Sequence, residues 1–123
     1  MRKVLFLALG AAMMISSGSA LASEDGAKTF KKRCAACHTV EAGKHKSGPS
    51  LAGIVGKKAG SSDFKRYKGL KGADFTWDED NLDAWIADSR KFAKAKLGGK
   101  TSMSVKIKKE EEREAIIEFL EAN

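Results

Sequence analysis

The chain has few residues that rigidify or cross-link a small protein, and no segment that would divide it into parts. It contains only one proline and two cysteines, and it shows no internal repeat and no long low-complexity linker. Two cysteines cannot build a scaffold of several disulfide bridges. No segment alternates apolar and polar residues over any length, as a half-buried strand would. These absences exclude a disulfide-rich fold and a sheet protein, and they indicate a single small domain.

The periodic segments indicate helices joined by long loops, and therefore an all-α fold. Ser23 is a possible N-cap for the first helix and Asp78 for the second. The last helix has apolar residues at helical spacing, and Glu110, Glu111 and Glu112 at the positive end of its dipole. The predicted helices cover residues 24–33, 78–89 and 109–122. A glycine-rich stretch from residue 43 to residue 60 is interpreted as a loop.

The N-terminus has the pattern of a secretory signal peptide. Met1-Arg2-Lys3 is positively charged, the stretch from Val4 to Ile15 is apolar, and Ala20-Leu21-Ala22 forms an A-x-A cleavage site. The apolar part is too short for a convincing membrane span, although an uncleaved N-terminal anchor is the alternative. We therefore expect a signal peptide over residues 1–22, cleavage after Ala22, and a working domain over residues 23–123 in the bacterial periplasm.

The run Cys34-Ala35-Ala36-Cys37-His38 is the most informative motif in the chain. C-x-x-C-H is the attachment signature of c-type haem. Two thiols one turn apart can each bond a vinyl group of the same porphyrin, and this tether leaves His38 placed to put an imidazole nitrogen on the iron. The motif predicts one covalent haem c, bound through Cys34 and Cys37, with His38 as an iron ligand.

Three other interpretations of the two cysteines fit the chain less well. A thioredoxin-like C-x-x-C needs a βαβ context, which is not visible here. A structural zinc site needs four ligands, and the predicted mature chain offers only Cys34, Cys37, His38 and His45, of which His38 follows Cys37 too closely. A disulfide between the two cysteines would close a very short loop and contribute little.

Met103 is the best candidate for the second axial ligand of the iron. The other three methionines lie in the predicted signal peptide, so Met103 is the only thioether of the predicted mature chain. It follows a glycine-rich segment, residues 97–102, and is flanked by Ser102 and Ser104, which argue against its alternative role as core filler. His45 is the rival ligand, but it stands between two lysines and is interpreted as solvated.

With these motifs in order, residues 24–123 resemble a class I c-type cytochrome, in the bacterial cytochrome c2 and mitochondrial-like branch. Gly26 and Phe30 match first-helix positions that pack on the C-terminal helix, where Phe119 takes the place of the aromatic partner. The resemblance implies a small fold of three or more helices wrapped around one covalently bound haem. It also implies that Cys34, Cys37, His38 and Met103 form the haem site.

Two further matches to the family lie between the attachment motif and Met103. Gly48-Pro49-Ser50-Leu51 resembles the Gly-Pro-x-Leu turn, whose proline carbonyl accepts a hydrogen bond from the proximal imidazole. Tyr67 and Trp77 resemble the aromatic pair that donates to a buried haem propionate, with plain core aromatics as the alternative.

The chain departs from the family pattern before Met103. No proline precedes the methionine, the stretch from Phe92 to Lys100 contains several extra residues, and Val105 stands where the family often has an aromatic residue. We therefore expect a longer and softer distal loop.

The resemblance implies a soluble monohaem electron carrier and not an enzyme, with no small-molecule substrate. Such a carrier shuttles between a quinol-oxidising membrane complex and a terminal oxidase or photosynthetic reaction centre. A haem catalyst or gas sensor with an open distal site is the second class, favoured only by the long loop.

The charge of the chain favours acidic protein partners. The full chain has a net charge of +7, and removal of the signal peptide removes two basic residues. Nine lysines flank the attachment and distal segments and would steer a monomeric carrier toward acidic docking surfaces on its membrane partners. They are lysines 28, 31, 32, 44, 46, 94, 96, 100 and 106. Export and the lack of an aromatic-basic motif argue against a nucleic-acid partner.

Overall fold

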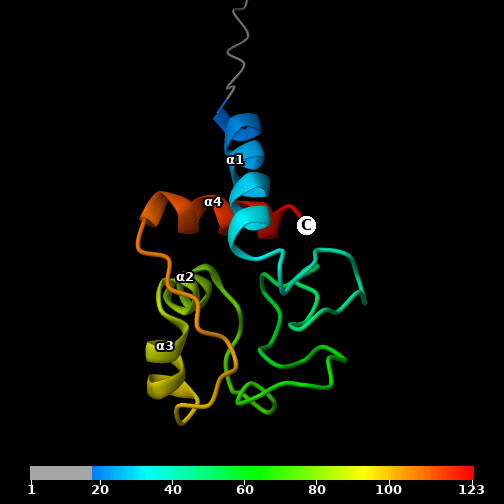
Figure 1. Cartoon of the computed structure of the whole chain (residues 1–123), viewed down its shortest axis with the longest axis vertical. Helices are drawn as coiled ribbons and strands as arrows, with labels where there is room; N and C mark the ends of the chain where they lie inside the picture. The colour runs from blue at the N-terminus through cyan, green and yellow to red at the C-terminus, as the bar shows by residue number, and fades with distance from the viewer. Residues whose placement is uncertain (1–17) are drawn as a thin grey trace, which may run out of the picture.

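The computed structural model describes residues 18–123, which form four α-helices joined by long loops (Figure 1). The helices are α1 (Gly18–Arg33), α2 (Glu79–Ala87), α3 (Ser89–Lys96) and α4 (Glu110–Glu121). Over this range the only β pairing is an isolated antiparallel bridge between Lys58 and Thr76. The predicted all-α fold is confirmed. Most of the predicted signal peptide lies outside the described residues, and from residue 18 onward no helix is both long and apolar enough to cross a membrane.

Helix α1 crosses α4, and small and aromatic side chains allow the two helices to approach closely (Figure 1). A Cβ atom added to Gly26 would lie 2.5 Å from the carbonyl oxygen of Ala115. One turn later the rings of Phe30 and Phe119 pack with their centroids 5.1 Å apart. These contacts confirm the predicted packing of Gly26 and Phe30 on the C-terminal helix.

The start of α1 differs from the prediction. The helix begins at Gly18 in the full chain, so Ser23 lies inside it and does not cap it. The residues before Ser23 are mainly alanine, leucine and serine, with no proline to stop a helix from extending in the N-terminal direction.

Helices α2 and α3 meet at a single residue, Asp88. Asp78 caps α2 as predicted, because its Oδ1 accepts a hydrogen bond of 2.8 Å from the backbone N–H of Asn81. Helix α2 ends at Ala87, and Asp88 is extended, with φ −164° and ψ 94°. Its Oδ1 then accepts from the N–H of Lys91 at 3.1 Å and caps α3. The predicted helix over 78–89 was therefore too long by a short margin, and α3 was not predicted.

Helix α3 also changes the description of the distal loop. Ser89–Lys96 includes much of the stretch that was assigned to that loop. The side chains of Phe92 and Ala93 are buried and anchor the helix to the core. Residues 92–96 are therefore helical, and the residues from Leu97 onward connect α3 to α4.

An aromatic cluster forms the centre of the core beside α2 and α3. Trp77 packs edge-on against Trp85 at 5.4 Å, and Trp85 packs edge-on against Phe92 at the same centroid distance. Phe75 closes the cluster against Trp77 at 5.0 Å. Each such pair stabilises the fold by about 0.5–1.5 kcal/mol beyond the area it buries.

In Figure 1 the loops of residues 34–76 lie on the opposite side of the view from α3 and the 97–109 segment.

Candidate haem centre

The attachment motif lies on a turn that continues α1. The N–H of Cys34 donates to the carbonyl of Phe30 at 2.7 Å, and the N–H groups of Cys37 and His38 both donate to the carbonyl of Cys34, at 3.1 and 2.9 Å. The turn brings Cys34 and Cys37 onto one short stretch of backbone, with both thiols free. Over residues 18–123 no three His, Cys, Asp or Glu side chains gather as they would around a metal ion, so the zinc interpretation gains no support.

Cys34 is the more deeply placed of the two thiols. It is half-buried against the core, whereas Cys37 is exposed. Burial raises the pKa of Cys34 to about 11, although the nearby Arg33 guanidinium acts in the opposite direction. Cys34 is therefore an uncharged thiol at neutral pH. An uncharged thioether sulfur would suit the same surroundings.

His38 is buried and has a fixed orientation. Its Nδ1 donates a hydrogen bond of 2.7 Å to the carbonyl of Pro49, as the Gly-Pro turn predicts. A carbonyl can only accept, so the proton is on Nδ1, and Nε2 keeps its lone pair for a metal. A Cβ atom on Gly48 would collide with the imidazole ring, so only glycine permits this approach. Burial lowers the pKa of His38, partly opposed by the hydrogen bond to Pro49. The lowered pKa favours the neutral imidazole, which is the form that can bind a metal.

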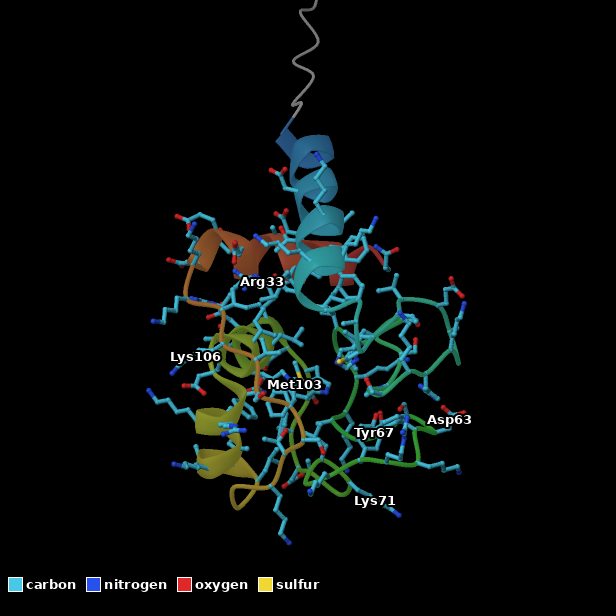
Figure 2. All side chains as sticks on the ribbon, viewed as in Figure 1. Arg33, Asp63, Tyr67, Lys71, Met103 and Lys106 are labelled. Carbon is cyan, nitrogen blue, oxygen red and sulfur yellow. The ribbon has the colours of Figure 1, made fainter. Side chains whose placement is uncertain are left out.

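Met103 packs against the core of the molecule. Figure 2 shows it on the segment between α3 and α4, in the middle of the view. Its side chain is half-buried against the core, and its backbone N–H donates to Thr101 Oγ1 at 3.0 Å. The indole N–H of Trp85 donates to its sulfur at 3.2 Å.

Trp85 is the neighbour of Met103 that the sequence analysis did not identify. It was assigned only to the apolar stripe of its helix. The one available signal was general, because a buried tryptophan usually finds an acceptor for its indole N–H.

Some apolar side chains of the described residues are left partly exposed. Several apolar side chains pack against the core yet remain partly uncovered by protein. They include Leu51, Ile54, Val55, Leu70, Leu97 and Val105. A small domain has few residues with which to cover such a surface, and a flat apolar macrocycle would do so. The partly exposed apolar side chains, the neutral Cys34 thiol and the free Nε2 of His38 all suit haem.

The two predicted propionate donors differ in their surroundings. The hydroxyl group of Tyr67 pairs with that of Ser62 at 2.5 Å. Trp77 is buried in the aromatic core, as its alternative role predicted. Their action on a propionate stays a prediction.

His45 is not solvated, and this prediction was wrong. Its Nδ1 accepts from the N–H of Ser50 at 2.9 Å, and its Nε2 pairs with Asp63 Oδ1 at 2.7 Å. Its two lysine neighbours in sequence suggested an exposed side chain, but the 61–68 loop folds over it. Because both ring nitrogens have partners, His45 has none free for iron in this arrangement.

The surface of the described residues carries exposed charges of both signs. All nine lysines that flank the attachment and distal segments are exposed. By contrast, carboxylates from α2 and α4 line a groove of about 340 Å³: Glu79, Asp80, Asp83, Glu110, Glu114 and Glu118. The pKa of the adjoining Glu121 is raised, mainly by a hydrogen bond with Glu79.

Comparison with known proteins identifies one family. A family model described as cytochrome c matches residues 23–123. Cytochrome c2 from Rhodospirillum rubrum is 38% identical over 94% of both chains. Cytochrome c2 iso-2 from Magnetospirillum molischianum is 41% identical over 71% of this chain and 87% of its own. The solved structure of cytochrome cH from Methylobacterium extorquens superposes with a TM-score of 0.71 at 33% identity, covering 82% of this chain and 98% of that one.

Proposed function

Because this chain belongs to the cytochrome c family, we propose that Cys34 and Cys37 form the two thioether bonds to its haem and that His38 and Met103 are the axial ligands. The all-α fold is that of a class I cytochrome c, and the cofactor of the family is covalently bound haem c. The observation that carries the ligand assignment is the buried His38 imidazole, whose Nδ1 is engaged by Pro49 while Nε2 is free.

The chain belongs to a family of electron carriers, and its ligand set suits that role. The haem supplies a one-electron iron couple when bound. A soft Met sulfur opposite a His nitrogen raises the reduction potential of such iron. With His38 and Met103 both bound to the iron, the haem would have no open position for oxygen or peroxide. We therefore propose a soluble monohaem carrier that is not an enzyme and takes no small-molecule substrate.

The partners and the location are proposed from charge and from the N-terminus. Exposed lysines near the attachment and distal segments would meet acidic surfaces on membrane complexes, and such encounters are weak and quickly reversed. The carrier would work as a monomer in the periplasm after cleavage following Ala22. It would pass electrons from a quinol-oxidising complex to a terminal oxidase or a photosynthetic reaction centre.

The second function class is a haem catalyst or gas sensor with an open distal site. That interpretation depends on a long loop before Met103, and α3 takes up five of the nine residues from Phe92 to Lys100. The two classes still differ in one direct measurement. An electron carrier resists carbon monoxide and cyanide, whereas a sensor with an open distal site binds them rapidly.

Substitution of Met103 tests the proposed ligand set. We expect the oxidised wild type to show the weak far-red band of a Met sulfur bound to iron. Met103→Ala should lose this band, bind carbon monoxide, and keep its covalent haem. Met103→His should stay six-coordinate. In both variants the reduction potential should fall, because the identity of the axial ligands shifts haem potentials over a range of about 0.8 V.

Leu97→Ala is the matched control for this test. Leu97 is half-buried against the same core and lies on the same connecting segment, so its truncation reports lost packing without a lost ligand. It should keep the far-red band. If Met103→Ala retains the wild-type band and potential, the distal ligand lies elsewhere.

A further inference from the structure

A chain of hydrogen bonds leads from the proximal imidazole to the surface through a single peptide group. The carbonyl of Pro49 accepts from His38 Nδ1 at 2.7 Å. The N–H on the other side of the same peptide belongs to Ser50, and it donates to His45 Nδ1 at 2.9 Å. Because Nδ1 of His45 accepts, its proton is on Nε2, which donates to Asp63 Oδ1 at 2.7 Å. Every donor in the chain therefore points in one direction, from His38 toward the carboxylate.

The loop that carries Asp63 is held firmly over His45. The Phe64 ring packs edge-on against His45 with the centroids 5.5 Å apart, and Tyr67 packs edge-on against Phe64 at 5.2 Å. Arg66 donates to the carbonyl of Lys46 at 2.7 Å. The side chain of His45 is only 23% exposed, whereas that of Asp63 is 79% exposed. The hydrogen-bond chain thus begins at the buried imidazole of His38 and ends at a carboxylate in water.

We infer that His45 and Asp63 are positioning residues for the proximal ligand, acting on His38 through the Pro49–Ser50 peptide. The inference rests on the proposed function, in which His38 binds the iron. Neither residue touches the haem site in this account. They fix the plane of the peptide whose carbonyl orients the His38 ring, and they polarise it.

The direction of the hydrogen bonds determines whether Asp63 raises or lowers the reduction potential. A carboxylate on His45 makes Nδ1 a stronger acceptor, so the Ser50 N–H is drawn toward it and the Pro49 carbonyl oxygen becomes more negative. A stronger bond from His38 to that carbonyl makes the imidazole more basic toward the metal. A more basic ligand favours ferric over ferrous iron and lowers the potential. The hydrogen bond from His45 also lowers the pKa of Asp63, so the carboxylate is charged at neutral pH.

Asp63→Asn in the intact haem protein is the direct test. The substitution keeps the size of an exposed side chain, so the fold should survive. Glu41→Gln is the matched control, because Glu41 is also an exposed carboxylate beside the 43–50 segment, and its side chain pairs with Lys44 and not with His45. Both variants remove one negative charge. Only Asp63→Asn weakens the hydrogen-bond chain.

Two readouts separate positioning from plain surface charge. The first is the reduction potential at about 1 M salt, where the screening length falls to about 3 Å and the direct effect of a distant surface charge is suppressed. The second is the NMR signal of the His38 Nδ1 proton in the ferrous protein. In Asp63→Asn we expect a higher potential, an upfield shift, and solvent exchange faster by about threefold to tenfold, the equivalent of one weakened hydrogen bond. Glu41→Gln should change none of these at high salt.

A double substitution tests whether the effect travels through His45. In a His45→Leu background, Asp63→Asn should produce no further shift in the potential or in the exchange of the His38 proton. If His45→Leu does not fold, Asp63→Asn alone decides. The inference is overturned if Asp63→Asn matches Glu41→Gln at high salt and leaves the His38 proton unchanged. The far-red band of the wild type tests the ligand set independently, so failure of the inference and failure of the proposed function are distinguishable.

Discussion

Replacing Gly26 with alanine sets two effects of opposite sign against each other. Alanine is the better helix former, by about 1 kcal/mol in an exposed helix interior. Gly26, however, faces α4, where a Cβ atom would lie 2.5 Å from the Ala115 carbonyl oxygen and 2.8 Å from Phe119 Cβ. The nearest obstacle is backbone and cannot rotate away. The two helices would have to separate before these atoms reached ordinary van der Waals contact, which begins at 3.4 Å.

The cost of this separation exceeds the gain in helix propensity. Overpacking a close contact costs about 1–3 kcal/mol. Separation would also weaken the Phe30–Phe119 pair, and such an aromatic pair contributes about 0.5–1.5 kcal/mol beyond its buried area. Against the gain of about 1 kcal/mol from propensity, we expect Gly26→Ala to lower the free energy of unfolding by about 1–3 kcal/mol.

Chemical unfolding of the haem protein, followed by circular dichroism, measures this change. Ala27→Gly calibrates it, because Ala27 is exposed on the same turn and its replacement changes helix propensity alone. That control should lose about 1 kcal/mol. If Gly26→Ala instead raises the free energy of unfolding by as much as Ala27→Gly lowers it, α1 and α4 do not approach as closely as the structure shows.

Four other substitutions test the haem site and its supports. Phe30→Ala should cost about 3–5 kcal/mol in the same unfolding assay, the usual range for a buried aromatic; an unchanged midpoint would show that the terminal helices do not pack as described. Cys34→Ala and Cys37→Ala should each leave at most one thioether, seen as an altered reduced spectrum or haem released by acid extraction, and haem fully bonded in both would contradict the attachment assignment. Trp85→Phe removes the indole N–H from the sulfur of Met103. The freed lone pair should make the sulfur a better donor to ferric iron and lower the reduction potential. An unchanged potential in spectroelectrochemistry would contradict this role of Trp85.

The elements that the sequence predicted well are those set by local chemistry. Asp78 could be identified as a cap because a cap acts over three residues of backbone. The C-terminal helix followed from its own apolar spacing. Helix α1 was misjudged at its start, where no residue type marks a stop. Helix α3 was missed because Asp88 ends one helix and begins the next without an intervening turn.

The haem site also combines residues that are close in sequence with contacts between residues that are far apart. The two thiols and the proximal histidine lie within five residues, since attachment and ligation act at one point on the porphyrin. The groups that would tune the iron come from farther away. His45 meets Asp63, and Trp85 meets Met103, each across 18 residues of chain. Neither contact leaves a spacing pattern, because each depends on how a loop folds over its neighbour. A chain can therefore keep the attachment motif unchanged while its potential shifts with a single distant side chain, and in this protein Asp63 and Trp85 are the positions at which that shift should occur.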